Sequence, residues 1–278
     1  MTCRELIRRA SESFCAAGIP DPVNDAALLL SHLTGRPPLA LRLDEETVLD
    51  PSVIDSFKSL SEQRLSRIPL QYLLGEAPFY GRMFRVDSRV LIPRPETELL
   101  CEWALELLKD RSSPRILDLC CGSGCIGITL KAEKSDAFVT CSDLSPDALS
   151  LASENAARLG VDVAFCRTDL LDGFATSGFD LIISNPPYIP SAVCADLQPE
   201  VKQEPLLALD GGPDGLSLYR RIIPDAMTTL VRGGILMMEL GQGEDAGVEK
   251  LLLEHSFINV EIREDLSGIR RMILARKP

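Results

Sequence analysis

Residues 115–124, RILDLCCGSG, decide the fold of the larger part of the chain. The first five residues form an apolar run with the length of a buried strand. The glycines that follow predict a tight turn into a helix, an arrangement typical of α/β proteins with a parallel sheet. The stretch therefore predicts the first strand of such a sheet, followed by a helix to about residue 134.

Strands and helices alternate after this turn. AFVTCS at 137–142 is expected to be the second strand, and Ser145-Pro146 to cap a helix that ends near Gly160. Further strands are expected at 161–167, 179–184, 234–240, 257–263 and 270–276. The last two lack an intervening helix and predict a hairpin with one antiparallel strand. The predicted fold class is α/β, with a doubly wound, seven-stranded, mostly parallel, Rossmann-like sheet.

Pro224 lies inside the helical pattern of residues 214–231. A proline in a helix interior lacks the backbone N–H and crowds the preceding turn. We therefore expect a kink or a break in this helix.

Residues 1–75 predict a small helical bundle. Apolar residues recur at helical spacing from Leu6 to Phe14, and Asp21-Pro22 and Asp50-Pro51 are each expected to begin a helix. Residues 76–97 mix aromatic and β-branched residues with glycine and proline, and predict a hairpin or extended connector. The expected domains are therefore a helical domain at 1–75, a connector at 76–97 and a catalytic domain at 98–278.

Composition limits the functional classes. The 278-residue chain has a net charge of −12, which argues against a protein that works mainly on nucleic acid. No apolar run approaches the roughly 18 residues that a membrane span needs. The nine cysteines include no CxxC pair and the chain has two histidines, so neither a zinc site nor a disulfide framework is expected. We expect reduced thiols, a cytoplasmic protein and no bound metal.

One segment departs from the acidic average. Residues 64–94 contain six arginines and two acidic residues, a local excess of +4. Two interpretations remain open: an ordinary solvated surface, or a docking strip for an acidic or RNA-associated partner.

The glycine-rich turn and a following acidic residue suggest a nucleoside site. Backbone N–H groups of such a turn can approach a ligand closely. Asp143 follows the second strand and lies 19 residues after Gly124, where a carboxylate can bind ribose hydroxyls. This pair alone equally allows a nicotinamide dinucleotide.

Asn185-Pro186-Pro187-Tyr188 follows the 179–184 strand and favours a different cofactor. The Asn185 side-chain oxygen and the Pro186 carbonyl can accept both hydrogens of a planar –NH2 group. The nitrogen lone pair would then face an electrophile, as methylation of an amide or aromatic amine requires. Tyr188 is expected to give an aromatic wall against the substrate.

The order of glycine-rich turn, ribose acid and NPPY resembles the class I S-adenosyl-L-methionine-dependent methyltransferases that act on amino groups. LIPRPETE at 91–98, EPLLALDGGPDGL at 204–216 and LSGIRRMILAR at 266–276 resemble the protein-(glutamine-N5) methyltransferases of bacterial peptide chain release factors (the PrmC/HemK family). This resemblance extends from about Asp25 to Lys277.

The resemblance implies the cofactor and its contacts. S-adenosyl-L-methionine is expected to bind a set of residues that includes Asp143, and to leave as S-adenosyl-L-homocysteine. The full set expected from the motifs is Cys120, Cys121, Gly122, Ser123, Gly124, Asp143, Asp169, Leu170 and Asn185. Cys120 stands where the family usually has glycine; cysteine is small enough to fit there with a negative φ, so we expect a slight adjustment and not a loss of cofactor binding. Leu170 replaces a frequent aromatic and should weaken stacking on the adenine.

The resemblance also implies the substrate, the glutamine of the GGQ loop of class I release factors, methylated on its side-chain amide nitrogen. Asn185, Pro186 and Tyr188 are the expected catalytic residues, and 185–188 the substrate clamp. The expected enzyme is a monomer that needs neither nucleic acid nor a membrane, and whose residues 1–75 dock the release factor. Two alternatives stay open: an amino-methyltransferase acting on nucleic acid, and a catalytically silent cofactor-binding module.

Overall fold

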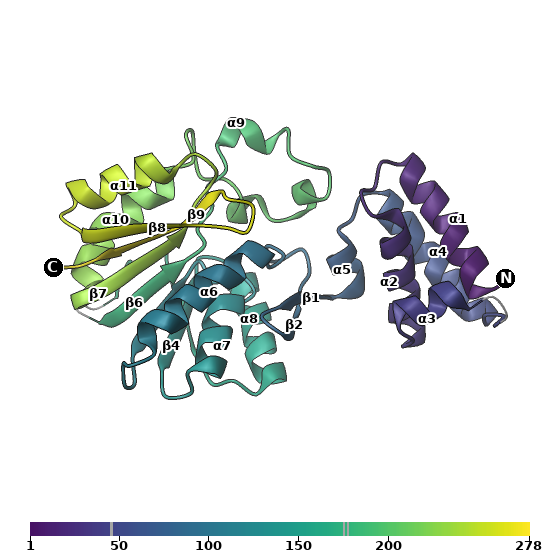
Figure 1. The fold of residues 1–278 in the computed structure, drawn as a ribbon, viewed down its shortest axis with the longest axis horizontal. Coiled ribbons are helices and arrows are strands. Elements are labelled where there is room, and N and C mark those ends of the chain that lie inside the picture. Colours follow the sequence, from purple (N-terminus) through teal and green to yellow (C-terminus); the bar gives the residue numbers. More distant parts are fainter. Residues whose placement is uncertain (45–46, 175, 177) are drawn as a thin grey trace. The chain divides into compact units, whose positions relative to one another are not determined.

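The computed structural model describes residues 1–44, 47–174, 176 and 178–278. The chain forms two compact units (Figure 1). Unit 1 comprises Met1–Glu76 and Gln198–Gln203, and unit 2 comprises Ala77–Leu197 and Glu204–Pro278. The expected division placed a boundary after residue 75 and did not include the short second segment of unit 1.

Unit 1 is helical. Its helices are α1 (Cys3–Ala16), α2 (Pro22–Thr34), α3 (Pro38–Leu43), α4 (Pro51–Leu65) and α5 (Leu70–Leu74). Thr2 and Glu5 form a capping box at the start of α1, and the Asp50 carboxylate accepts from the N–H of Ser52 at the start of α4. The apolar faces of these helices share one core, which includes Phe14, Leu29 and Phe57.

The segment Gln198–Gln203 is bound within unit 1 by ion pairs. Glu200 accepts from Arg64 Nη1 at 2.9 Å and from Arg67 Nη2 at 2.7 Å. Arg64 is itself buried, and its Nε donates to Asp25 at 2.8 Å. Two of the six arginines of residues 64–94 are thus neutralised inside this unit.

Unit 2 contains a seven-stranded sheet with the strand order β5-β4-β3-β6-β7-β9-β8. The strands are β3 (Arg115–Leu119), β4 (Phe138–Asp143), β5 (Ala164–Arg167), β6 (Phe179–Ser184), β7 (Leu230–Glu239), β8 (Ile258–Glu264) and β9 (Arg270–Arg276). β9 runs antiparallel to β7 and β8, while β3, β4, β5, β6 and β7 pair in parallel. A separate hairpin joins β1 (Glu76–Phe79) to β2 (Arg82–Arg85). The predicted α/β class and mostly parallel sheet are confirmed.

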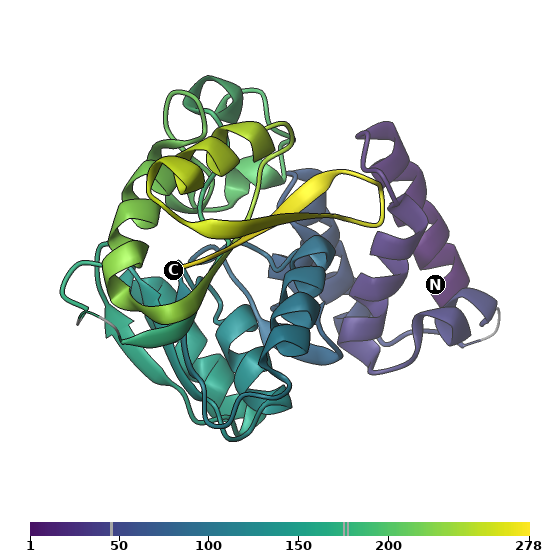
Figure 2. The same ribbon diagram turned by 60° about the vertical axis from the view of Figure 1, so that its left-hand side comes forward.

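Helices cover both faces of this sheet (Figures 1 and 2). One face packs against α6 (Pro95–Leu108), α7 (Cys125–Glu133) and α8 (Pro146–Leu159), and the other against α10 (Ser217–Thr229) and α11 (Asp245–Glu254). Successive residues of a strand face opposite sides, so Ile116 joins the first core and Leu117 the second. The loop after β6 carries α9 (Ser191–Cys194) and two short 3₁₀ helices, η1 (Val201–Gln203) and η2 (Leu206–Ala208).

Pro224 lies inside α10, which continues through it without a break. Tyr219, Ile222, Ile223 and Ala226 are all buried, on both sides of the proline. Burial of this face offsets the missing backbone hydrogen bond, because tertiary packing supplies most of the stability of a helix. Of the two expected outcomes, the break was wrong, and the kink stays a prediction.

The other four arginines of residues 64–94 are paired within unit 2. Arg82 contacts Glu133 at 2.6 Å, Arg85 and Arg89 both contact Glu154 at 3.1 Å, and Arg94 contacts Glu204. Carboxylates from distant parts of the sequence therefore compensate the local charge excess. The interpretation of this segment as a docking strip loses its main support.

Candidate active site

The site lies where the order of the strands reverses. From β3 the chain passes to β4 and β5 on one side, and then returns to β6 on the other side of β3. Ligands of doubly wound folds bind beyond the carboxyl ends of the strands at such a point. The turn 120–124 follows β3, Asp143 ends β4, and Asn185 follows β6. The fold thus brings together three motifs that lie far apart in the sequence.

The turn after β3 uses left-handed backbone at three positions. Gly122 has φ +53° and Gly124 has φ +77°, where only glycine is unstrained. Cys120 has φ +60°. Cysteine was expected to fit this position with a negative φ, but the backbone bends here as it would with glycine. A cysteine in this conformation costs about 1–2 kcal/mol.

Gly124 serves packing as well as the turn. A Cβ at Gly124 would lie 2.9 Å from the Ile128 Cδ1 atom and 3.1 Å from the Ala152 Cβ atom. Gly122 differs, because a Cβ there would meet no protein atom within 4 Å. Gly124 therefore allows α7 to approach α8, and Gly122 leaves open space beside the cavity.

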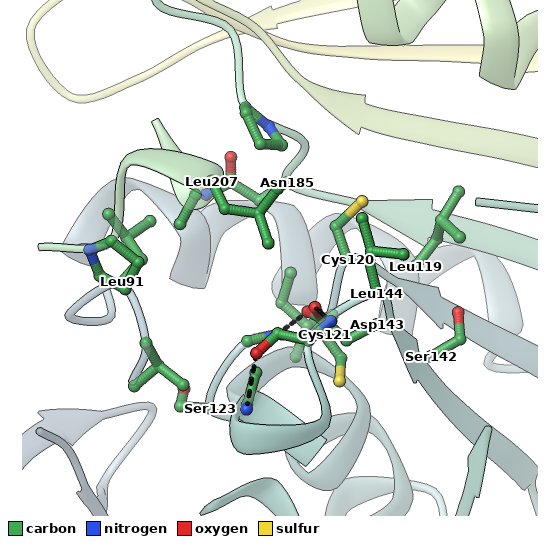
Figure 3. Close-up of a pocket in the computed structure, with 18 of the residues that line it drawn as sticks. Leu91, Leu119, Cys120, Cys121, Ser123, Ser142, Asp143, Leu144, Asn185 and Leu207 are labelled. Carbon is green, nitrogen blue, oxygen red and sulfur yellow. Dashed lines mark hydrogen bonds between the residues drawn. The ribbon is translucent and has the colours of Figure 1, made fainter. Parts of the chain in front are cut away.

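Asp143 is held by backbone donors. Its Oδ2 accepts from the Gly122 N–H and its Oδ1 from the Ser145 N–H, each at 2.9 Å. Burial raises the pKa of this carboxyl above its usual value. Figure 3 shows Asp143, Ser123 and Asn185 around one space. The carboxylate keeps further acceptor capacity for ligand hydroxyls, since each oxygen can accept more than one hydrogen bond.

These residues line a cavity of about 260 Å³ in unit 2. Of the residues expected from the sequence, the lining includes Cys120, Cys121, Gly122, Ser123, Asp143, Asp169, Leu170, Asn185 and Pro187. Gly124, Pro186 and Tyr188 are not among its lining residues. Gly124 is the N-cap of α7, Pro186 is buried beside the wall, and the Tyr188 hydroxyl donates to Glu239 Oε1 at 3.4 Å.

Asp169 and Leu170 form another part of the wall. The Asp169 carboxylate pairs with Arg221 at 2.8 Å, and Arg221 also lines the cavity. Leu170 is buried and has φ +51°, a second left-handed position without glycine. Its apolar side chain gives a surface for a flat ring, without the stacking that an aromatic side chain would add.

Two segments complete the wall of the cavity, residues 91–98 and 204–216. Both were identified in the sequence only as family motifs. Leu91, Pro93 and Arg94 come from the first, and Pro205, Leu207 and Ala208 from the second. Glu204 joins them, since its carboxylate accepts from the Ile92 N–H at 3.0 Å and from Arg94. Figure 3 shows Leu91 and Leu207 among the residues around the space that Asn185 lines.

Sequence reasoning missed Thr97, Glu204 and Glu239. Thr97 and Glu239 are each 2% exposed, and Thr97 Oγ1 donates to Glu239 Oε2 at 2.6 Å. Burial raises the pKa of Glu239 to about 7. One signal was available, because Glu239 is an acidic residue inside the apolar run GILMMEL, and buried carboxylates usually have a specific partner.

The residues present fit a nucleoside-containing methyl donor such as S-adenosyl-L-methionine. Asp143 suits ribose hydroxyls, Leu144 and Leu170 give apolar surface, and the open space at Gly122 allows a ligand to approach the backbone. Among the residues with described coordinates, no group of three His, Cys, Asp or Glu side chains is placed to hold a metal ion. None of the described helices is long and apolar enough to cross a membrane.

Comparison with known proteins relates the chain to methyltransferases. Residues 97–198 match the methyltransferase small domain, and residues 5–75 match the PrmC N-terminal domain. A methyltransferase from Pyrococcus furiosus has a similar structure, with a TM-score of 0.57 and 17% identity over 78% of this chain and 98% of that one. The fold and the matched domain define an enzyme of the methyltransferase class.

Two curated relatives identify the family. A release factor glutamine methyltransferase from Deinococcus radiodurans is 42% identical, covering 100% of this chain and 99% of its own. Another from Chlorobaculum tepidum is 42% identical, covering 96% of this chain and 94% of its own. The chain belongs to the family of release factor glutamine methyltransferases, and the resemblance found in the sequence is confirmed.

Proposed function

We propose that this enzyme transfers a methyl group from S-adenosyl-L-methionine to the side-chain amide nitrogen of the GGQ glutamine in class I peptide chain release factors. The observation that carries the proposal is the position of Asn185. It lines the same cavity as Asp143 and residues 120–123 of the turn, at the carboxyl ends of adjacent strands. A nucleoside site and an amide-binding site therefore share one cavity.

When bound, the cofactor supplies a methyl group activated by its sulfonium sulfur. Asn185 Oδ1 and the Pro186 carbonyl accept the two amide hydrogens of the substrate and aim its nitrogen into the cavity. An amide nitrogen is a poor nucleophile, because its lone pair is delocalised into the carbonyl. Orientation is thus the main contribution of the protein, and it can supply about 7–11 kcal/mol at best.

Asn185 and Pro186 also stabilise the charge that forms on the substrate nitrogen during transfer. Positive charge develops on the amide nitrogen as its bond to the methyl carbon forms and the bond from that carbon to sulfur breaks, and the charge is removed when one amide proton leaves to water. Two acceptors already in place stabilise this charge without reorganising. The buried prolines at 186 and 187 fix the backbone that presents the acceptors.

We further propose that residues 1–75 dock the body of the release factor. One glutamine side chain offers little surface for selection, whereas stable protein interfaces bury about 1,200–2,000 Å² in total. The match of residues 5–75 to a domain named for this family supports a dedicated role.

The test is methylation of an intact release factor. The full-length enzyme is incubated with purified release factor or with DNA, together with isotopically labelled cofactor, and the GGQ peptide is analysed by mass spectrometry. The expected result is one methyl group on the glutamine and none on DNA. Label on DNA, or none on the release factor, would refute the proposal.

A further inference from the structure

Asn185 is held by a chain of hydrogen bonds that ends on a buried carboxyl. Its Nδ2 lies 3.3 Å from Thr97 Oγ1, and Thr97 Oγ1 lies 2.6 Å from Glu239 Oε2. Three separate elements supply these residues: the first turn of α6, the residue after β6 and the end of β7. Neighbouring strands β6 and β7 pair Ser184 with Met238, so Asn185 and Glu239 are the next residues along each strand.

The number of available protons determines which atom donates in each hydrogen bond of this series. A threonine hydroxyl has one hydrogen to donate, and an ionised carboxylate can only accept. The distance of 2.6 Å is in the range of about 2.5–2.7 Å typical of a hydroxyl bonded to a carboxylate. When Glu239 is ionised, Thr97 therefore gives its hydrogen to Glu239, and an oxygen lone pair of Thr97 remains to accept from Asn185.

The direction decides how the Asn185 amide is turned. Thr97 can accept a hydrogen but has none left to donate, so Asn185 must present its –NH2 group to Thr97. The Asn185 Oδ1 atom then faces away from Thr97. In the opposite rotamer the amide –NH2 would meet the –NH2 of a substrate glutamine, and two donors would face each other.

We propose that Thr97 and Glu239 are positioning residues that fix the amide of Asn185 with its oxygen toward the substrate nitrogen. This inference rests on the proposed function for its substrate, but the hydrogen-bond chain is a property of the protein alone. Thr97 and Glu239 are both buried, so water does not compete for these bonds. Tyr188, whose hydroxyl donates to Glu239 Oε1, helps to hold the carboxyl in place.

The first test replaces Thr97 in the full-length enzyme, at about pH 8, above the pKa of about 7 for Glu239. Thr97→Val keeps the side-chain shape and removes the hydroxyl, whereas Thr97→Ser keeps the hydroxyl. With intact release factor, Thr97→Val should lower kcat about tenfold or more, with cofactor affinity and KM within about threefold of wild type. Thr97→Ser should stay within about threefold of the wild-type kcat. A fully active valine variant, or a serine variant as poor as valine, would overturn the inference.

The second test replaces the carboxyl. Glu239→Gln can still accept from Thr97 through its amide oxygen, and should keep most of the activity. Glu239→Met is similar in size but offers no comparable acceptor, so Thr97 is free to donate to Asn185 Oδ1 and reverse the amide. Equal kcat for the glutamine and methionine variants would also overturn the inference.

A third measurement does not depend on turnover. In ¹⁵N-labelled enzyme, the side-chain –NH2 signals of Asn185 are identified by their loss in Asn185→Asp. They should shift and exchange faster with solvent in Thr97→Val and Glu239→Met, and stay unchanged in Thr97→Ser. Signals that are identical in all variants would refute the hydrogen-bond chain. A wild-type enzyme that fails to methylate the release factor would instead refute the proposed function.

Discussion

Replacing Glu239 by glutamine should make the protein more stable at alkaline pH than at acidic pH, relative to wild type. Glu239 is buried, and burial raises its pKa from the usual 4.5 to about 7. Between these two values the folded protein holds a proton that the unfolded chain releases. The stability of wild type therefore falls as the pH rises through this window, because the folded state must ionise a buried carboxyl.

The magnitude follows from the two pKa values. Their difference corresponds to about 3 kcal/mol, of which about 2–3 kcal/mol is lost between pH 5 and pH 8. Glutamine has no proton to lose and keeps an acceptor for Thr97. The free energy of unfolding of Glu239→Gln minus that of wild type should therefore increase by about 2–3 kcal/mol from pH 5 to pH 8.

Urea unfolding at several pH values measures this difference directly, and other titrating groups cancel between variant and wild type. The control is a carboxyl whose pKa is shifted in the opposite direction. Arg220 holds the pKa of Asp214 at about 2, so Asp214→Asn should show no pH-dependent effect above pH 5. If the difference between Glu239→Gln and wild type stays constant within about 0.5 kcal/mol over this range, the carboxyl is not buried as the structure shows it.

Three further substitutions test the cavity and the turn beside it. Asn185→Ala should lower kcat about 100-fold or more in a folded protein, because it removes one preorganised acceptor; turnover within threefold of wild type would contradict the clamp. Asp143→Ala should weaken cofactor binding by about 1.5–3 kcal/mol with less effect on saturated turnover, and calorimetry showing unchanged affinity would place the ribose elsewhere. Gly124→Ala should lower the free energy of unfolding by about 1–3 kcal/mol, since a left-handed φ and contact with Ile128 both oppose a side chain; unchanged urea unfolding would refute this.

The central strands of the sheet were predictable because they are buried on both faces. Continuous apolar runs gave β3, β6 and β9 with the bounds that the structure shows. β5 begins at Ala164, three residues later than expected, because Val161 still donates its N–H to the Ala156 carbonyl at the end of α8. The short helices α3 and α5 were missed, since each has at most six residues and follows a proline, too little for a helical period to appear.

Cavity residues could be predicted where a local sequence motif indicates their role. They could not be predicted where the role depends on a hydrogen-bond partner far away in the sequence. Asp143 could be located from its spacing and Asn185 from its motif, because each follows a strand and the carboxyl ends of parallel strands meet at one edge of the sheet. The hydrogen bond between Thr97 and Glu239 joins residues 142 positions apart. Glu239 stands out inside an apolar run, but no local pattern identifies Thr97 as its partner. The positive φ of Cys120 was equally hidden, because most cysteines in proteins have negative φ.

The segment Gln198–Gln203 of unit 1 affects how a truncation of residues 1–75 is interpreted. Deleting residues 1–75 is the obvious test of docking, but it also removes Arg64 and Arg67, which neutralise Glu200. Glu200 lies in the loop between Asn185, at the cavity, and Glu204, which fixes the Leu91–Arg94 wall. Releasing the middle of this loop can disturb the cavity whether or not the helices bind a release factor. A loss of methylation after truncation therefore supports docking only if a variant that loses Glu200 alone, such as Glu200→Gln, keeps its activity.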